Sequence, residues 1–204
     1  MILNLEKLHK KYDMKVTGVI HVGAHFGHEN KIYDSLSYEN RVFFEPCKRT
    51  FDILSNNIKN WPLHNVALGS SVGTAEMFVE RHNNGQSSSL LEPHLHLKQY
   101  PAIKFSERET VAVETLDRMI DNKRLFNFIN MDVQGYELEV LKGGVRILNH
   151  IEYIMTEVNR SELYKSCPMV EDLDDFLQTY KFSRVETNWL GGTWGDAFYI
   201  KNWK

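Results

Sequence analysis

Residues 16–27 read VTGVIHVGAHFG and join an apolar, β-branched run to a loop that holds two glycines. The run predicts a buried strand over 16–22, because β-branched residues favour strands, and Gly23 ends it. Segments with apolar residues at helical spacing separate this run from others like it, which predicts a mostly parallel, doubly wound α/β sheet. The other predicted core strands are 41–44, 65–68, 126–131 and 151–156, and 182–185 and 197–200 predict a final antiparallel hairpin.

The section 70–114 interrupts this alternation. Half-exposed strands are predicted at 74–80 and 110–114, and the polar stretch between them holds one glycine, three serines and two prolines. We expect an inserted β-hairpin, or flap, that carries a mobile loop. His94 and His96 alternate in a predicted strand of this flap, where solvated side chains are expected.

The composition is that of an ordinary folded domain. Of the 204 residues 42% are hydrophobic and 25% are charged, so we expect one ordered domain over 1–204. The net charge of −3 disfavours a nucleic-acid partner, and no apolar stretch approaches the roughly 20 residues that span a membrane. The chain starts without a secretory leader pattern, and Cys47 and Cys167 form no disulfide framework, which favours a cytoplasmic protein.

The loop at 23–29 is the first candidate site, because ligands of open α/β sheets bind beyond the carboxyl ends of the strands. Gly23 and Gly27 let the backbone turn tightly and approach a ligand. The dinucleotide pattern G-x-G-x-x-G is not met, since histidines stand at 25 and 28, while Glu45 ends the second strand and can accept hydrogen bonds from a ribose. These features favour S-adenosylmethionine, an adenosyl ligand without a pyrophosphate. The alternative is a tight turn followed by a solvated acid.

Several motifs in order give a family resemblance. HVGAHFGHE, FEP, NVALG, VETLDR, INMDVQGYELEVLKGG, TEVN and WGDAFYI lie between about residues 19 and 200, and together they resemble the FkbM-type methyltransferases. The resemblance implies a class I methyltransferase fold with a seven-stranded sheet, S-adenosylmethionine as cofactor, and hydroxyl groups of small molecules and sugars as acceptors. The chain has Gln134 where that family often has Glu, which leaves Asp132 as the acid of this motif.

The resemblance and the strand ends together assign the cofactor site. The first loop would hold the methionine part, Glu45 the ribose, 65–67 the adenine and Asp132 the reacting end. The expected cofactor-binding residues are Gly23, Ala24, His25, Gly27, Glu29, Glu45, Pro46, Asn65, Ala67 and Asp132.

The catalytic candidates are Asp132, Glu157 and His25. Two carboxylates at neighbouring strand ends suit removal of a hydroxyl proton or a divalent cation site, to which Asp196 would add a third acid. Structural alternatives are a helix cap for Asp132 and turn positions for the other two acids. A zinc site on His25 and His28 is disfavoured, because the sequence supplies no further ligands at a fixed spacing.

Four residues are candidates for contact with the acceptor. Hydroxyl groups of the flap loop could close over the site, and a tryptophan face stacks well on the C–H face of a sugar. Flexible-loop positions and core packing are the alternatives. The candidates are Ser88, Ser89, Tyr136 and Trp194.

The expected function is transfer of a methyl group from S-adenosylmethionine to a hydroxyl of a sugar or glycan. The alternatives are an NAD-dependent oxidoreductase on a similar fold and a non-catalytic module that binds an adenosyl ligand. The expected partner is a small-molecule or glycan acceptor, and the chain could be one domain of a larger glycan-building protein. The sequence leaves open whether a divalent cation takes part.

Overall fold

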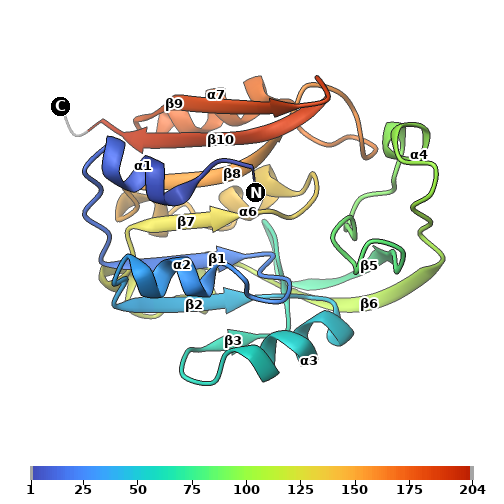
Figure 1. The fold of residues 1–204 in the computed structure, drawn as a ribbon, viewed down its shortest axis with the longest axis horizontal. Helices are drawn as coiled ribbons and strands as arrows, with labels where there is room; N and C mark the ends of the chain where they lie inside the picture. Colours follow the sequence, from blue (N-terminus) through green and yellow to red (C-terminus); the bar gives the residue numbers. More distant parts are fainter. Residues whose placement is uncertain (1, 203–204) are drawn as a thin grey trace.

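A seven-stranded sheet forms the centre of the computed structural model, which describes residues 2–202. Its strands are β1 (Gly18–Val22), β2 (Asn40–Phe44), β3 (Leu63–His64), β7 (Phe128–Met131), β8 (Tyr153–Asn159), β9 (Phe182–Leu190) and β10 (Trp194–Lys201). They lie in the order β3-β2-β1-β7-β8-β10-β9 (Figure 1). All neighbours are parallel except β10, which runs antiparallel to both β8 and β9. The predicted mostly parallel sheet with a final hairpin is confirmed.

Helices cover both faces of this sheet. Residues Val19 and Ile20 of β1 point to opposite faces, and each belongs to a separate apolar cluster. On the Val19 face pack α1 (Leu5–Lys11), α2 (Asn30–Ser35) and α3 (Lys48–Asn57). On the Ile20 face pack α5 (Leu116–Met119), α6 (Glu137–Lys142), α7 (Val170–Thr179) and the 3₁₀ turn η2 (Ile147–Asn149), and a second 3₁₀ turn, η1 (Lys123–Leu125), precedes β7. All five residues of β1 are buried, as expected for a parallel strand between helices.

The strand order reverses beside β1. From β1 the chain runs outward through β2 and β3 on one side, and through β7 and β8 on the other. The loops after β1 and β7 therefore meet at the carboxyl edge of the sheet, which is where open α/β sheets bind ligands.

A smaller sheet forms the flap. It contains β4 (Ala67–Leu68), β5 (Gly73–Val79) and β6 (Glu107–Glu114) in the order β4-β6-β5, and Figure 1 shows it beyond the carboxyl ends of β1 and β2. β5 and β6 pair antiparallel, as the sequence predicted. The predicted single strand at 65–68 is wrong, because β3 ends at His64 and the chain then leaves the main sheet. The Asn65 side chain fixes this departure by donating hydrogen bonds to the carbonyls of Glu45 and Pro46 (2.9 and 2.8 Å).

The polar stretch between β5 and β6 is more ordered than its composition predicted. It contains a short helix, α4 (Leu95–Gln99), and the three serines 87–89 are buried. The expectation of a strand with solvated histidines at 94–96 is wrong: His94 caps α4, and His96 lies in the helix with 4% of its surface exposed. The ring of His96 packs among aromatic side chains, which explains its burial.

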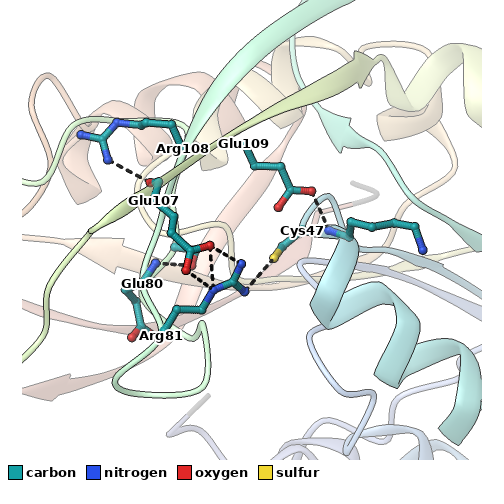
Figure 2. A network of polar contacts seen from close by, with 8 residues as sticks. Cys47, Glu80, Arg81, Glu107, Arg108 and Glu109 are labelled. Carbon is teal, nitrogen blue, oxygen red and sulfur yellow. Dashed lines mark hydrogen bonds and ion pairs between the residues drawn. The ribbon is translucent and has the colours of Figure 1, made fainter.

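Polar contacts fasten the base of the flap to the start of α3. The Arg81 guanidinium donates to both carboxylate oxygens of Glu107 (3.0 Å each from Nε) and approaches Cys47 Sγ at 4.0 Å (Figure 2). Glu109 accepts a hydrogen bond from the backbone N–H of Lys48 (2.8 Å). The flap is therefore held where β2 passes into α3, directly beside the predicted ribose-binding acid. Among residues 2–202, no helix combines the length and the apolar character that crossing a bilayer requires.

Candidate functional site

A cavity of about 420 Å³ opens at the carboxyl edge of the main sheet, under the flap. The loops that follow β1, β2, β7 and β8 form its floor, and the flap and the final hairpin close its other sides. Of the predicted site residues, all but Asn65, Gly27 and Asp196 line this cavity.

The first loop follows β1 so closely that only glycine fits at its start. Gly23 has a φ of +74°, and a Cβ there would lie 1.9 Å from the carbonyl oxygen of Asp132. The N–H groups of Gly23 and Ala24 both donate to the carbonyl of Phe44 (3.0 and 2.9 Å). Gly27 also has a positive φ, and its α-carbon packs against α3 side chains instead of facing the cavity. The result is a backbone cradle between the ends of β1, β2 and β7.

Glu45 lies at the floor of this cradle with both carboxylate oxygens in use. Oε2 accepts the N–H of His25 and Oε1 accepts the N–H of Cys47, each at 3.0 Å. Burial raises the pKa of Glu45 to about 7, although these two hydrogen bonds act in the opposite direction. Each carboxylate oxygen can accept a second hydrogen bond, so the side chain retains capacity for ribose hydroxyls.

The adenine candidates separate into lining and supporting residues. Pro46 and Ala67 line the cavity, with Val66 and Leu68 beside them. Asn65 supports the wall from behind through its bonds to the Glu45 and Pro46 carbonyls.

His25 connects the first loop to the flap. Its φ is +49°, its ring stacks on Phe26 with centroids 3.8 Å apart, and its Nε2 donates to the carbonyl of Asn84 (2.8 Å). Glu29 lines the cavity farther along the same loop. Burial acts to raise the pKa of Glu29, but the nearby His21 and a backbone hydrogen bond outweigh it, and the pKa lies below its usual value.

The acidic centre is organised by an amide. Gln134 Nε2 donates to Asp132 Oδ1 and to Glu157 Oε2, both at 2.8 Å, and Gln134 Oε1 accepts from the hydroxyl of the buried Tyr164 (2.8 Å). The two carboxyl groups predicted from neighbouring strand ends are therefore brought together, on either side of a neutral side chain. Burial raises the pKa of Glu157 well above its usual range, and the nearby acids Asp132 and Glu137 add to the effect. The protonated form of Glu157 is favoured.

Asp196 lies beside Glu157 on the neighbouring strand, but its carboxylate holds the N-terminal segment. The two residues are paired in the register of β8 and β10. Asp196 Oδ2 accepts the backbone N–H groups of Ile2 and Leu3, the second at 2.8 Å, and burial raises the Asp196 pKa to about 6. Within residues 2–202, no group of three or more His, Cys, Asp and Glu side chains has an arrangement that could hold a metal ion.

All four acceptor candidates face the cavity. Ser89 Oγ donates to the carbonyl of Gln134 (2.7 Å), and Ser88 Oγ accepts the N–H of Glu80 (3.2 Å), so both hydroxyls also stabilise the flap. Trp194 Nε1 donates to the hydroxyl of Tyr100 (2.8 Å), and Tyr136 lines the floor.

Other residues of the site were missed in the sequence. His21 lines the cavity from within β1, and its Nδ1 lies 3.2 Å from the Tyr33 hydroxyl; a polar residue inside the run VTGVIHV was the available signal. Glu137 accepts the N–H groups of Val133 and Gly135 (3.2 and 3.1 Å) and so shapes the loop after β7. Tyr164 lies in a segment without a periodic pattern, and nothing in the sequence indicated its position. His96 was expected in a solvated strand and lies instead in α4, at the cavity wall.

Comparison with known proteins identifies the family of this chain. The model of the methyltransferase FkbM domain matches residues 21–184. A 2-O-methyltransferase, NoeI of Sinorhizobium fredii (strain NBRC 101917 / NGR234), is 26% identical over 175 residues, which cover 80% of this chain and 72% of that protein.

Solved structures agree on the fold. The Streptococcus pneumoniae protein Sp1610 in complex with S-adenosyl-L-methionine superposes with a TM-score of 0.53 at 13% identity, covering 98% of this chain and 73% of that one. A ribosomal protein L11 methylase of Lactobacillus delbrueckii subsp. bulgaricus gives 0.52 at 9% identity, with 97% and 76% covered. The family model spans most of the chain and the sheet has the class I methyltransferase order, so the protein belongs to the FkbM family of S-adenosylmethionine-dependent methyltransferases.

Proposed function

We propose that the protein transfers a methyl group from S-adenosylmethionine to a hydroxyl oxygen of a sugar or glycan. The observation that carries the proposal is the pair of acids, Asp132 and Glu157, held 2.8 Å from one amide at the end of the cradle. A neutral alcohol is a poor nucleophile, so such an enzyme needs a general base at this place, and a carboxylate can serve as one. The relationship to a 2-O-methyltransferase supports oxygen as the methylated atom.

The cofactor supplies an electrophilic methyl group on a sulfonium. In this proposal the first loop binds the methionine part, Glu45 accepts hydrogen bonds from the ribose, and Pro46 and Ala67 contact the adenine. Gly23 supports these roles, because the cradle exists only where the chain lacks a Cβ. Binding in this way would fix the position of the methyl carbon for in-line attack by an acceptor oxygen, and the flap over the cavity limits the access of water.

Asp132 is the proposed base. Glu157 is deeply buried and favours its protonated form, whereas Asp132 is half-buried at the cavity wall. Gln134 fixes the orientation of the Asp132 carboxylate through Oδ1 and leaves Oδ2 for the acceptor hydroxyl. His25 is the weaker candidate, since its Nε2 proton is engaged by the Asn84 carbonyl. A cation shared by Asp132 and Glu157 is also less favoured, because the Gln134 amide, a hydrogen-bond donor, contacts both of them.

The test is a methyl-transfer assay with S-adenosylmethionine and a panel of glycosides, read by mass spectrometry. A product that is one methyl group heavier, with the methyl on oxygen by NMR, is expected. Methylation at nitrogen or carbon only would overturn the proposal. Calorimetric titration with S-adenosylhomocysteine and NAD adds a second readout: binding of NAD alone would support an oxidoreductase, and cofactor binding without transfer to any acceptor would support a non-catalytic module.

A further inference from the structure

The cavity has a second end that the cofactor cradle does not use. Its walls come from α4 and the segment after it, from the chain after β8, and from the final hairpin. We call it the aromatic end, and it is formed by His96, Tyr100, Ile103, Leu163, Leu190 and Trp194.

Hydrogen bonds hold the two sides of the aromatic end together. Trp194 Nε1 donates to the Tyr100 hydroxyl (2.8 Å), which links β10 to the flap. The Gln99 side chain reinforces the link, because its Nε2 donates to the Tyr100 hydroxyl and its Oε1 accepts from Thr193 Oγ1, each at 2.9 Å. Two aromatic rings are therefore fixed in place at the cavity wall before any ligand arrives, which lowers the entropy lost on binding.

His96 adds a polar group to this wall. Its ring centroid lies 5.0, 5.2 and 5.5 Å from those of Tyr100, Phe105 and Tyr164, and burial lowers its pKa, so the imidazole is neutral at pH 7. Its Nδ1 is buried without a hydrogen-bond partner among residues 2–202. His96 also lines the cavity, so a ligand hydroxyl, which both donates and accepts, can bond to the edge of the imidazole that faces the cavity.

The charges of the residues that line the cavity also favour an uncharged ligand. Four carboxyl side chains line it, those of Glu29, Glu45, Asp132 and Glu157, and no Lys or Arg of residues 2–202 does so. A phosphate group on the acceptor would be taken out of water in a cavity where the described residues offer no cation to pair with it, which is strongly unfavourable. A neutral polyhydroxylated ring meets no such penalty.

We infer that the aromatic end binds an uncharged sugar ring and rejects phosphorylated sugars. Trp194 and Tyr100 contact the C–H face of the ring, and His96 hydrogen-bonds one of its hydroxyls. The inference rests on the proposed function, because it assigns the acceptor of that same reaction. It adds the charge of the acceptor and the residues that select it.

The test measures sugar binding to the protein saturated with S-adenosylhomocysteine, by calorimetry and by quenching of tryptophan fluorescence. The probes are the methyl glycosides of glucose, galactose, mannose and N-acetylglucosamine, and the 6-phosphate of each. We expect at least one neutral glycoside to bind, and its 6-phosphate to bind at least tenfold more weakly.

Three variants locate the binding. Trp194→Ala should weaken glycoside binding at least tenfold, and His96→Phe, which keeps an aromatic ring of similar size, should weaken it severalfold. Leu97→Ala, on the exposed side of α4, is the matched control and should change nothing. All three should bind S-adenosylhomocysteine like the parent, which also shows that they fold.

The outcomes distinguish a failure of the proposed function from a failure of the inference about the acceptor. If the parent fails to bind S-adenosylhomocysteine, the proposed function fails. If it binds S-adenosylhomocysteine but no neutral glycoside, or binds the 6-phosphates equally well, the inference is overturned while cofactor binding stands. Unchanged glycoside affinity in both Trp194→Ala and His96→Phe would also overturn it.

Discussion

The two ends of the cavity are formed by different parts of the polypeptide, the backbone at one end and side chains at the other. At the cofactor end the backbone sets the shape: Gly23 and Ala24 donate to the Phe44 carbonyl, and two backbone N–H groups hold the Glu45 carboxylate in place. At the aromatic end it offers side chains, such as Trp194 and Tyr100, that lie 94 residues apart in sequence. A site that is shaped by the backbone follows from the strand order and tolerates many sequences. A site that is lined by side chains changes with single substitutions. The difference suggests that the fold fixes the cofactor and that the flap and hairpin choose the acceptor.

The strongest way to break this comparison is Gly23→Ala. The added Cβ would lie 1.9 Å from the Asp132 carbonyl oxygen, at a φ of +74° that non-glycine residues rarely adopt. Strain and overpacking together cost roughly 2–6 kcal/mol. We expect loss of S-adenosylhomocysteine binding and a large fall in melting temperature. Gly73→Ala, where nothing lies within 4 Å, is the control and should melt like the parent. Normal cofactor binding by Gly23→Ala would show that the cradle does not depend on this close approach.

Asp132→Asn tests the boundary between the two ends. The substitution keeps the shape of the side chain and removes its charge, so the proton of the acceptor has no carboxylate to accept it. Turnover should fall by roughly 10²–10⁴, the usual scale for general acid–base catalysis. Cofactor affinity should change much less, because Glu45 and the first loop remain. If saturating cofactor restores the rate, Asp132 binds the cofactor instead of the acceptor proton.

Glu45→Ala should produce the opposite pattern. Hydrogen bonds to a charged group contribute about 1.5–3 kcal/mol, so the dissociation constant of S-adenosylhomocysteine should rise roughly tenfold or more. Glycoside binding at the aromatic end should persist once cofactor is saturating. Calorimetry of both ligands on one variant checks the two expectations together, and parental cofactor affinity would remove Glu45 from the site.

The smallest expected effect is a dependence of stability on pH. Burial raises the pKa values of Glu45 and Glu137 to about 7 and that of Asp196 to about 6. Unfolded carboxyls release their protons near pH 4, so between about pH 4.5 and 7 the folded state binds more protons and stability falls as pH rises. The protein without cofactor should melt several degrees lower at pH 8 than at pH 5. Glu137→Gln, which cannot ionise, should reduce this difference; a melting temperature that rises across the window would contradict the prediction.

The residues of the cofactor end could be predicted from the sequence, whereas Trp194 was the one predicted residue of the aromatic end. Strand periodicity placed Gly23, Glu45, Asp132 and Glu157 at the carboxyl edge, and the structure brings these residues to one cavity. Periodicity works there because buried parallel strands have a strong apolar pattern. α4 has five residues in a polar stretch, too few to show a helical period, so His96 was misplaced in a strand.

Long-range contacts were equally hidden from the sequence. The bond between Trp194 and Tyr100, and the position of Tyr164 under Gln134, depend on how the flap packs on the hairpin. Asn65 was expected at the ligand, and the structure shows its amide bonded to two backbone carbonyls. The residue type alone does not distinguish an asparagine that bonds to the backbone from one that binds a nucleobase.

The contacts between flap and floor set a scale for how often the site opens. His25 Nε2 bonds to the Asn84 carbonyl, and Ser89 Oγ bonds to the Gln134 carbonyl. Each such bond contributes about 0.5–1.5 kcal/mol net, so these two alone favour the closed arrangement by a ratio of roughly 5 to 150. The Trp194–Tyr100 and Gln99–Thr193 bonds also hold the flap, so the closed arrangement is favoured by more than this ratio. Release of S-adenosylhomocysteine would then require the breaking of contacts that lie outside the reacting atoms.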